Sequence, residues 1–115
     1  LFYPGAKIIP TGTSLDGNHL AKFMTPDDYK KSSDEWLKEN GYFEKEINRK
    51  IDVYGNIAQV FSTFEAYNDP TDPYPALRGI KSIQLLNDGT RWWIINVYWM
   101  QETRTKPIPR DYLPD

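Results

Sequence analysis

Several polar side chains that could bind a ligand or take part in a reaction lie among apolar residues in the strand-like segments of this chain. Arg49 and Ser62 fall opposite each other when residues 42–54 and 57–67 pair across a tight Gly-Asn turn. An arginine among apolar neighbours keeps its charge and needs an acceptor. The sequence therefore allows an anion or carbonyl anchor at Arg49 and Ser62, or an ion pair of Arg49 with Glu46 or another carboxylate.

A second polar group lies on the segments 77–86 and 91–99, which flank an Asn-Asp-Gly turn. A three-residue turn with glycine in the left-handed position pairs Gln84 with Trp92, Ser82 with Ile94, Ile80 with Asn96 and Arg78 with Tyr98. A two-residue turn would instead place Gln84 opposite Trp93. Polar residues in such strands either satisfy one another or point at a ligand. Three of them, Ser82, Gln84 and Asn96, join Arg49 and Ser62 as candidate ligand-binding residues.

Other residues offer weaker signals for chemistry. The aromatic residues Trp36, Trp92, Tyr98 and Phe64 either pack in the core or form a wall for a flat hydrophobic molecule, and Trp36 is included among the binding candidates. His19 is the single histidine, and with no cysteine the sequence offers no metal-binding pattern. We predict no metal and no cofactor, and no catalytic residue is assigned. The plausible carboxylates are Glu44, Glu46 and Glu65, whereas Asp16 lies in a turn near His19 and is expected to be solvated.

One helix is predicted between residues 25 and 41. Thr25 is a good N-cap, Pro26 suits the first helical position, and Gly41 supplies the stop. The spacing of the apolar residues makes the helix amphipathic, and we expect Trp36 to be its buried main anchor, packed across the mouth or floor of the concave sheet face.

The remaining segments predict strands and a tail. Strands are expected at residues 6–12, 19–24, 42–54, 57–67, 77–86 and 91–99, and residues 103–115 are expected to form an extended, proline-rich tail. In the Gly-Asn hairpin, Tyr54 should pair with Ile57 and Ile47 with Phe64. The last strand, between Trp92 and Trp99, is apolar on both faces, so each face needs a cover.

Composition limits the class of protein. The 115 residues suit one domain, 1–115, and the net charge of −2 without a basic block disfavours nucleic acid as a partner. No apolar run approaches the roughly 20 residues of a membrane span. The chain opens at Leu1 without an initiator Met, so we expect a mature form or a fragment, and the sequence leaves cytoplasmic and exported locations equally open.

Two stretches carry a resemblance, "GYFEKEINRKIDVYGNIAQVFSTFEAY" and "RGIKSIQLLNDGTRWWIINVYW". They resemble the nuclear transport factor 2-like superfamily, and most of all its bacterial branch of small domains related to the polyketide cyclases. The opening "LFYPGAK" is similar to the loop that follows a helical hairpin in these proteins. Members usually begin with one or two long helices, which this chain lacks, so we expect those helices to have been trimmed.

The resemblance implies an α+β fold, a cone-shaped curled antiparallel sheet of about six strands packed on helices. It implies a cavity on the concave face and a homodimer through the convex face. The leading hypothesis is binding of a small, largely apolar molecule in the cone. The alternatives are an isomerase, cyclase or dehydratase that uses a pocket acid or base, and a structural interaction module.

Overall fold

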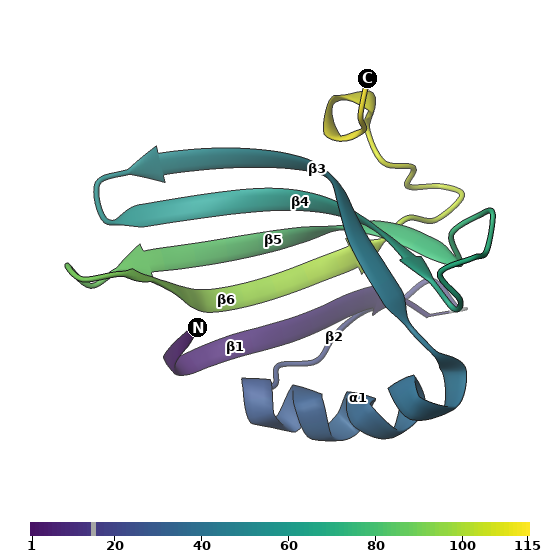
Figure 1. Cartoon of the computed structure of the whole chain (residues 1–115), viewed down its shortest axis with the longest axis horizontal. Helices are drawn as coiled ribbons and strands as arrows, with labels where there is room; N and C mark the ends of the chain where they lie inside the picture. Colours follow the sequence, from purple (N-terminus) through teal and green to yellow (C-terminus); the bar gives the residue numbers. More distant parts are fainter. Residues whose placement is uncertain (15) are drawn as a thin grey trace.

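A computed structural model describes residues 1–14 and 16–115 (Figure 1). It contains one six-stranded sheet in the order β2-β1-β6-β5-β4-β3 and one α-helix. The elements are β1 (Phe2–Thr13), β2 (His19–Ala21), α1 (Pro26–Asn40), β3 (Phe43–Tyr54), β4 (Ile57–Tyr67), β5 (Leu77–Asn87), β6 (Trp92–Gln101) and the 3₁₀ helix η1 (Arg110–Tyr112). The predicted α+β class and the six strands are confirmed.

The sheet is mixed, not fully antiparallel as predicted. Strands β3 to β6 form successive antiparallel pairs, but β6 then lies parallel to β1. Parallel pairing needs a long connection, and here α1 and four strands separate β1 from β6. The segment that resembles a loop, residues 1–7, is largely part of β1.

The sheet curls around one face, because β3 bends toward α1 at its start (Figure 1). We call the face that meets α1 the concave face; it carries Ile8, Phe64, Lys81, Val97 and Trp99. The opposite, convex face carries Asp52, Gln59, Phe61, Gln84 and Tyr98. The alternation of side chains along each strand separates the two sets.

Helix α1 begins and ends where the sequence predicts. The Thr25 hydroxyl accepts a hydrogen bond from the Asp28 amide at 3.1 Å, and the Gly41 amide donates to the Leu37 carbonyl at 3.0 Å. Gly41 has a φ of 71°, and a Cβ there would lie 2.5 Å from the Asn68 carbonyl oxygen. Glycine is therefore required at this helix end.

The helix is held differently from the prediction. Tyr29 packs edge-on against Trp99, with ring centroids 5.5 Å apart, whereas Trp36 stays 50% exposed and meets the Tyr42 ring at 6.3 Å. The prediction that Trp36 is the enclosed main anchor is wrong. Trp36 lies in the second half of α1, and no residue of this helix is fully buried.

The β3–β4 hairpin has the predicted register near its turn, with Tyr54 opposite Ile57 and Arg49 opposite Ser62. An irregularity between Glu46 and Asn48 then shifts the pairing, so that Glu46, not Ile47, lies opposite Phe64. A β-bulge inserts one residue and turns the following side chains over. As a result Glu44 and Glu46 both lie on the concave face.

The predicted β5–β6 register is wrong. Gln84 pairs with Asn96, Ser82 with Tyr98 and Ile80 with Met100. The connection spans residues 88–91, because the Asp88 carboxylate accepts hydrogen bonds from Thr90, Arg91 and the Trp93 indole. These bonds, led by those from Thr90, hold the pKa of Asp88 well below its usual range. A shift between Gln84 and Leu85 also places Ile94 with Val97 on the concave face.

The C-terminal tail covers part of the convex face. Ile108 is buried, its amide donates to Glu102 at 2.8 Å, and the Thr63 hydroxyl donates to the Tyr112 carbonyl at 2.6 Å. The tail ends in η1, so it is anchored at two points. No helix among the described residues is long and apolar enough to cross a membrane.

Candidate functional site

A cavity of about 330 Å³ lies between α1 and the concave face of the sheet. Most of its wall is apolar or aromatic, contributed by Phe2, Ile8, Trp36, Leu37, Phe64, Val97 and Trp99. Its polar lining is Tyr29, Ser33, Tyr42, Glu44 and Lys81. An apolar pocket with a few convergent polar groups is the usual form of a small-molecule site.

Three of the polar groups that line this cavity contact one another. The Tyr42 hydroxyl donates to Glu44 Oε2 at 2.6 Å, and the Lys81 ammonium contacts Glu44 Oε1. Lys81 Nζ also lies 5.1 Å from the centroid of the Phe64 ring. Two strands supply this cluster, since Tyr42 directly precedes β3, Glu44 lies in β3 and Lys81 lies in β5.

Both tyrosines in the cavity stay protonated at neutral pH. Burial, reinforced by the hydrogen bond to Glu44, raises the pKa of Tyr42 far above its ordinary value. Burial and then the negative charge of Glu44 raise the pKa of Tyr29. Each phenol can therefore donate a hydrogen bond but is a poor proton acceptor.

The cavity offers hydrogen-bond donors to a ligand. An ammonium has three N–H groups, and among the described residues Lys81 donates only to Glu44. Both oxygens of Glu44 already accept a hydrogen bond. A ligand oxygen beside Lys81 would thus meet unused N–H groups of the ammonium.

Arg49 and Ser62 lie on the concave face, but outside this cavity. Arg49 Nε lies 2.9 Å from Glu46 Oε1, and the Ser62 hydroxyl donates to Glu46 Oε2 at 2.5 Å. Burial of Glu46 acts to raise its pKa, but the bonds from Ser62 and Arg49 outweigh it, so the pKa falls. Of the two alternatives for Arg49, the structure therefore shows the ion pair, and the carboxylate is that of Glu46.

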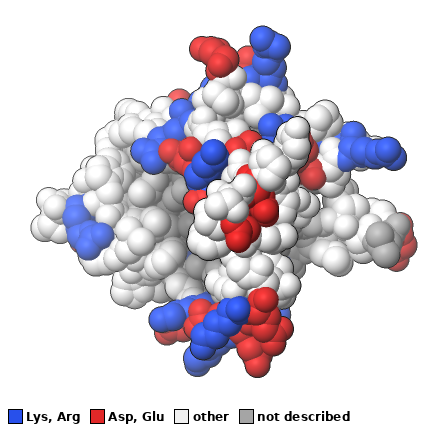
Figure 2. Space-filling view, turned by 45° about the vertical axis from the view of Figure 1, so that its right-hand side comes forward, with Lys and Arg blue, Asp and Glu red and all other residues white. Residues whose placement is uncertain are grey.

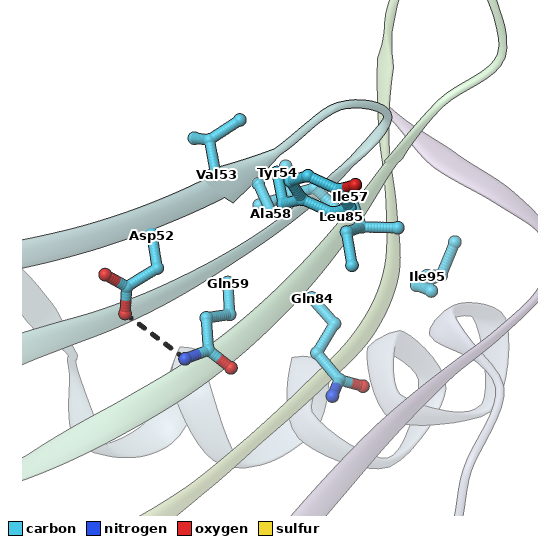
Figure 3. Close-up of a pocket in the computed structure, with 9 residues that line it drawn as sticks. All are labelled: Asp52, Val53, Tyr54, Ile57, Ala58, Gln59, Gln84, Leu85 and Ile95. Carbon is cyan, nitrogen blue, oxygen red and sulfur yellow. Dashed lines mark hydrogen bonds between the residues drawn. The ribbon is translucent and has the colours of Figure 1, made fainter.

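The other candidates lie on the convex face. Gln84 accepts a hydrogen bond from the Asn96 amide at 3.2 Å, and Ser82 lies opposite Phe61 and Tyr98. A second cavity of about 360 Å³ is lined by Asp52, Tyr54, Gln59 and Gln84 among others (Figure 3). The six candidate residues therefore divide between two faces, and Trp36 alone lines the cavity beside α1.

The sequence reasoning missed Tyr42 and Lys81, and it named Glu44 only as a possible carboxylate. The alternation of Tyr42 and Glu44 along a strand that follows a helix stop could have placed both near the helix. Lys81 could not have been added without the register of β4 with β5, in which it lies opposite Ser62.

The remaining sequence signals do not form a site. His19 is exposed and lies 3.4 Å from the Thr13 hydroxyl, while Asp16 is bonded within its own turn. Among residues 1–14 and 16–115, no group of three or more His, Asp or Glu side chains is arranged to hold a metal ion. Figure 2 shows acidic and basic side chains interspersed on the face in view.

Comparison with solved structures supports the fold. A protein of unknown function with a cystatin-like fold from Nostoc punctiforme matches 90% of this chain and 72% of its own, with TM-score 0.66 and 12% identity. An uncharacterised cystatin-like protein from Caulobacter vibrioides matches 91% and 73%, with TM-score 0.60 and 13% identity. A nuclear transport factor 2-like protein of unknown function from Shewanella baltica matches 89% and 73%, with TM-score 0.52 and 15% identity.

No protein-family model and no curated protein matches the sequence. The chain has the cystatin-like, nuclear transport factor 2-like fold: a curled six-stranded sheet with a helix against its concave face. The expected fold is thereby confirmed.

Proposed function

We propose that residues 1–115 form one domain that binds a small, largely apolar molecule between α1 and the concave face. The observation that carries the proposal is the Tyr42–Glu44–Lys81 cluster in the lining of a cavity with aromatic walls. The volume, about 330 Å³, falls within the roughly 300–1,000 Å³ of ligand pockets. Aromatic walls favour a flat ligand, and the free N–H groups of Lys81 favour one with an acceptor oxygen.

The test is a titration with 2-acetylnaphthalene, a flat molecule with one ketone oxygen, followed by amide chemical shifts in NMR spectra. We expect shifts to concentrate on α1, Tyr42 and Lys81. Lys81→Met keeps the aliphatic chain and removes the ammonium, so it should weaken binding about tenfold, the value of one hydrogen bond to a charged group. Lys45→Met, whose side chain is 62% exposed outside the cavity, is the matched control.

Shifts that scatter over the sheet, or equal affinities of the two variants, would refute the site. Absence of binding by any flat apolar probe would favour the interaction-module hypothesis instead.

An acid–base enzyme is the second candidate, favoured by a carboxylate, an ammonium and a phenol meeting in one cavity. Lys81 would hold a carbonyl oxygen while Glu44 removed a proton from the neighbouring carbon. Exchange of the acetyl protons of 2-acetylnaphthalene in D₂O, measured by NMR, tests this reaction. The exchange should be faster with the wild-type protein than with Glu44→Gln, and equal rates would exclude it for this probe.

We also propose a homodimer through the convex face. Tyr54 is 84% exposed, Ile57 60%, and Tyr98 41%, and all three belong to that face. Exposed apolar side chains grouped on one surface mark an interaction site. The placement in the branch related to the polyketide cyclases likewise remains a proposal, supported by the two quoted stretches.

A further inference from the structure

The charges in the lining of the cavity beside α1 balance each other. Among the described residues, the two charged side chains of this lining are Glu44 and Lys81, and they contact each other. The other polar residues that the structure describes there are Ser33 and two tyrosines, Tyr29 and Tyr42, whose pKa values burial raises, so that both are uncharged at neutral pH. A molecule bound here therefore meets one negative and one positive charge side by side.

The Glu44–Lys81 pair is largely enclosed. The side chain of Glu44 is 25% exposed and that of Lys81 is 26% exposed, whereas Arg49 of the Arg49–Glu46 pair is 58% exposed and lies outside the cavity. Water and salt screen an enclosed charge less, so the charges of the pair act strongly on each other and on a ligand. The Tyr42 hydroxyl donates to the second oxygen of Glu44 at 2.6 Å and thereby holds the carboxylate beside Lys81.

A charged ligand gains little from this pair. Because the N–H directions of an ammonium are tetrahedral, an oxygen bonded to Lys81 at about 2.8 Å lies roughly 4–5 Å from the Glu44 oxygen that Lys81 contacts. A ligand carboxylate at that place is attracted by Lys81 and repelled by Glu44, so the two effects largely cancel. The loss of its hydration on entering an apolar cavity is then not offset. The same reasoning, with the two roles exchanged, applies to a ligand ammonium.

An uncharged carbonyl group avoids this cost. Its oxygen accepts a hydrogen bond from Lys81 and carries only a partial charge, so Glu44 repels it weakly. We infer that the cavity selects uncharged carbonyl compounds over carboxylates and ammonium compounds, and that Glu44 is the residue that determines this selectivity. The inference rests on the proposed binding function and adds the charge class of the ligand.

Three probes that share a naphthalene ring test this selectivity. They are 2-acetylnaphthalene, which is uncharged, 2-naphthoate, which is an anion at pH 7, and 2-(aminomethyl)naphthalene, which is a cation at pH 7. Their dissociation constants for the full chain are measured by NMR titration at pH 7 in about 0.15 M salt, which screens the exposed charges. The wild-type protein should bind the ketone about tenfold or more tightly than either ion.

Two variants should change the preference in opposite directions. Glu44→Gln keeps an acceptor for Tyr42 but leaves the charge of Lys81 unbalanced, so 2-naphthoate should gain about tenfold or more in affinity relative to the ketone. Lys81→Met leaves Glu44 unbalanced and should shift the preference toward the cation. Glu46→Gln is the matched control, because Glu46 lies on the same strand and face in an ion pair outside the cavity, and it should keep the wild-type order of affinities. Unfolding in urea verifies that each variant is folded.

The results distinguish failure of this inference from failure of the proposed binding function. A wild-type protein that binds either ion as tightly as the ketone would overturn the charge selection, while the cavity would stand as a binding site. A Glu44→Gln protein that keeps the wild-type order of affinities would do the same, and if that variant does not fold, an unchanged order in Lys81→Met has the same meaning. If no probe shifts the amides beside the cavity of the folded wild-type protein, the binding function itself fails, and the inference with it.

Discussion

Gly79 is a position where one added methyl group should disturb the cavity floor. A Cβ built there would lie 2.5 Å from the Met100 carbonyl oxygen and 2.9 Å from Phe64 Cζ. Phe64 is 3% exposed and lies opposite Gly79 across the β4–β5 pair, so its ring covers the glycine. Met100 lies in β6 opposite Ile80, so its carbonyl cannot withdraw without disturbing the β5–β6 pairing.

The change in the free energy of unfolding caused by Gly79→Ala is the difference between two opposing effects. Alanine in place of glycine restricts the unfolded chain and contributes about 0.4–1 kcal/mol of stability. Overpacking a closed site costs about 1–3 kcal/mol, and here the upper end applies, because one of the two contacted groups is backbone. We therefore expect Gly79→Ala to lower the free energy of unfolding by about 2 kcal/mol.

Urea unfolding followed by tryptophan fluorescence measures this change. The matched control is Gly12→Ala in β1, where a Cβ meets no atom within 4 Å and φ is not positive. The control should leave the free energy of unfolding unchanged or raise it slightly. A Gly79→Ala protein as stable as the Gly12→Ala protein would refute the close packing of Phe64 on Gly79. A displaced Phe64 ring should also weaken 2-acetylnaphthalene binding, since Phe64 lines the cavity.

Three further predictions concern the helix, the β5–β6 loop and the tail. Trp36→Ala should lower the free energy of unfolding in urea by about 2 kcal/mol, half the usual loss for a buried tryptophan, because the side chain is 50% exposed. Tyr29→Ala should lower it at least as much, because Tyr29 packs against Trp99. A larger loss for Trp36→Ala than for Tyr29→Ala would contradict the packing described. Because the pKa of Asp88 is lowered in the folded state, its stabilisation is present above about pH 4 and is lost as the pH falls further, so Asp88→Asn should lower the urea midpoint at pH 7 and flatten its decline in acid. Glu102→Ala removes the acceptor of the Ile108 amide and the partner of Arg78, so limited proteolysis should release residues 103–115 sooner than in the wild type, and an unchanged cleavage rate would show that the tail is held elsewhere.

Local signals predicted the elements well. Thr25, Pro26 and Gly41 set the limits of α1 because capping and left-handed backbone depend on residues within one turn. The Gly-Asn turn set the register of β3 with β4 out to Arg49 and Ser62. Arg49 and Ser62 therefore lie opposite each other as predicted. The group that both side chains contact is the Glu46 carboxylate, three residues before Arg49 in β3.

Long-range geometry decided the rest. Two irregularities, near Ile47 in β3 and near Ile95 in β6, change which side chains share a face. The residue type at neither position predicts a β-bulge. The hydrogen bonds of Asp88 set the length of the β5–β6 loop, and Gln84 pairs with Asn96 instead of the predicted Trp92. A shift of this kind transfers whole sets of residues between faces.

The sequence by itself determined the helix, the strands and the surplus of apolar residues on both sides of β6, because these follow from residue types and short spacings. Only the tertiary structure decided that Tyr42, Glu44 and Lys81 meet beside α1, and that Asp52, Gln59, Gln84 and Asn96 align on the opposite face. The first cluster joins β3 to β5, and the second extends from the β3–β4 hairpin to β6. Their members are brought together by strand register and by the curl of the sheet, which arise from the sum of many pairings and are not encoded at any one residue.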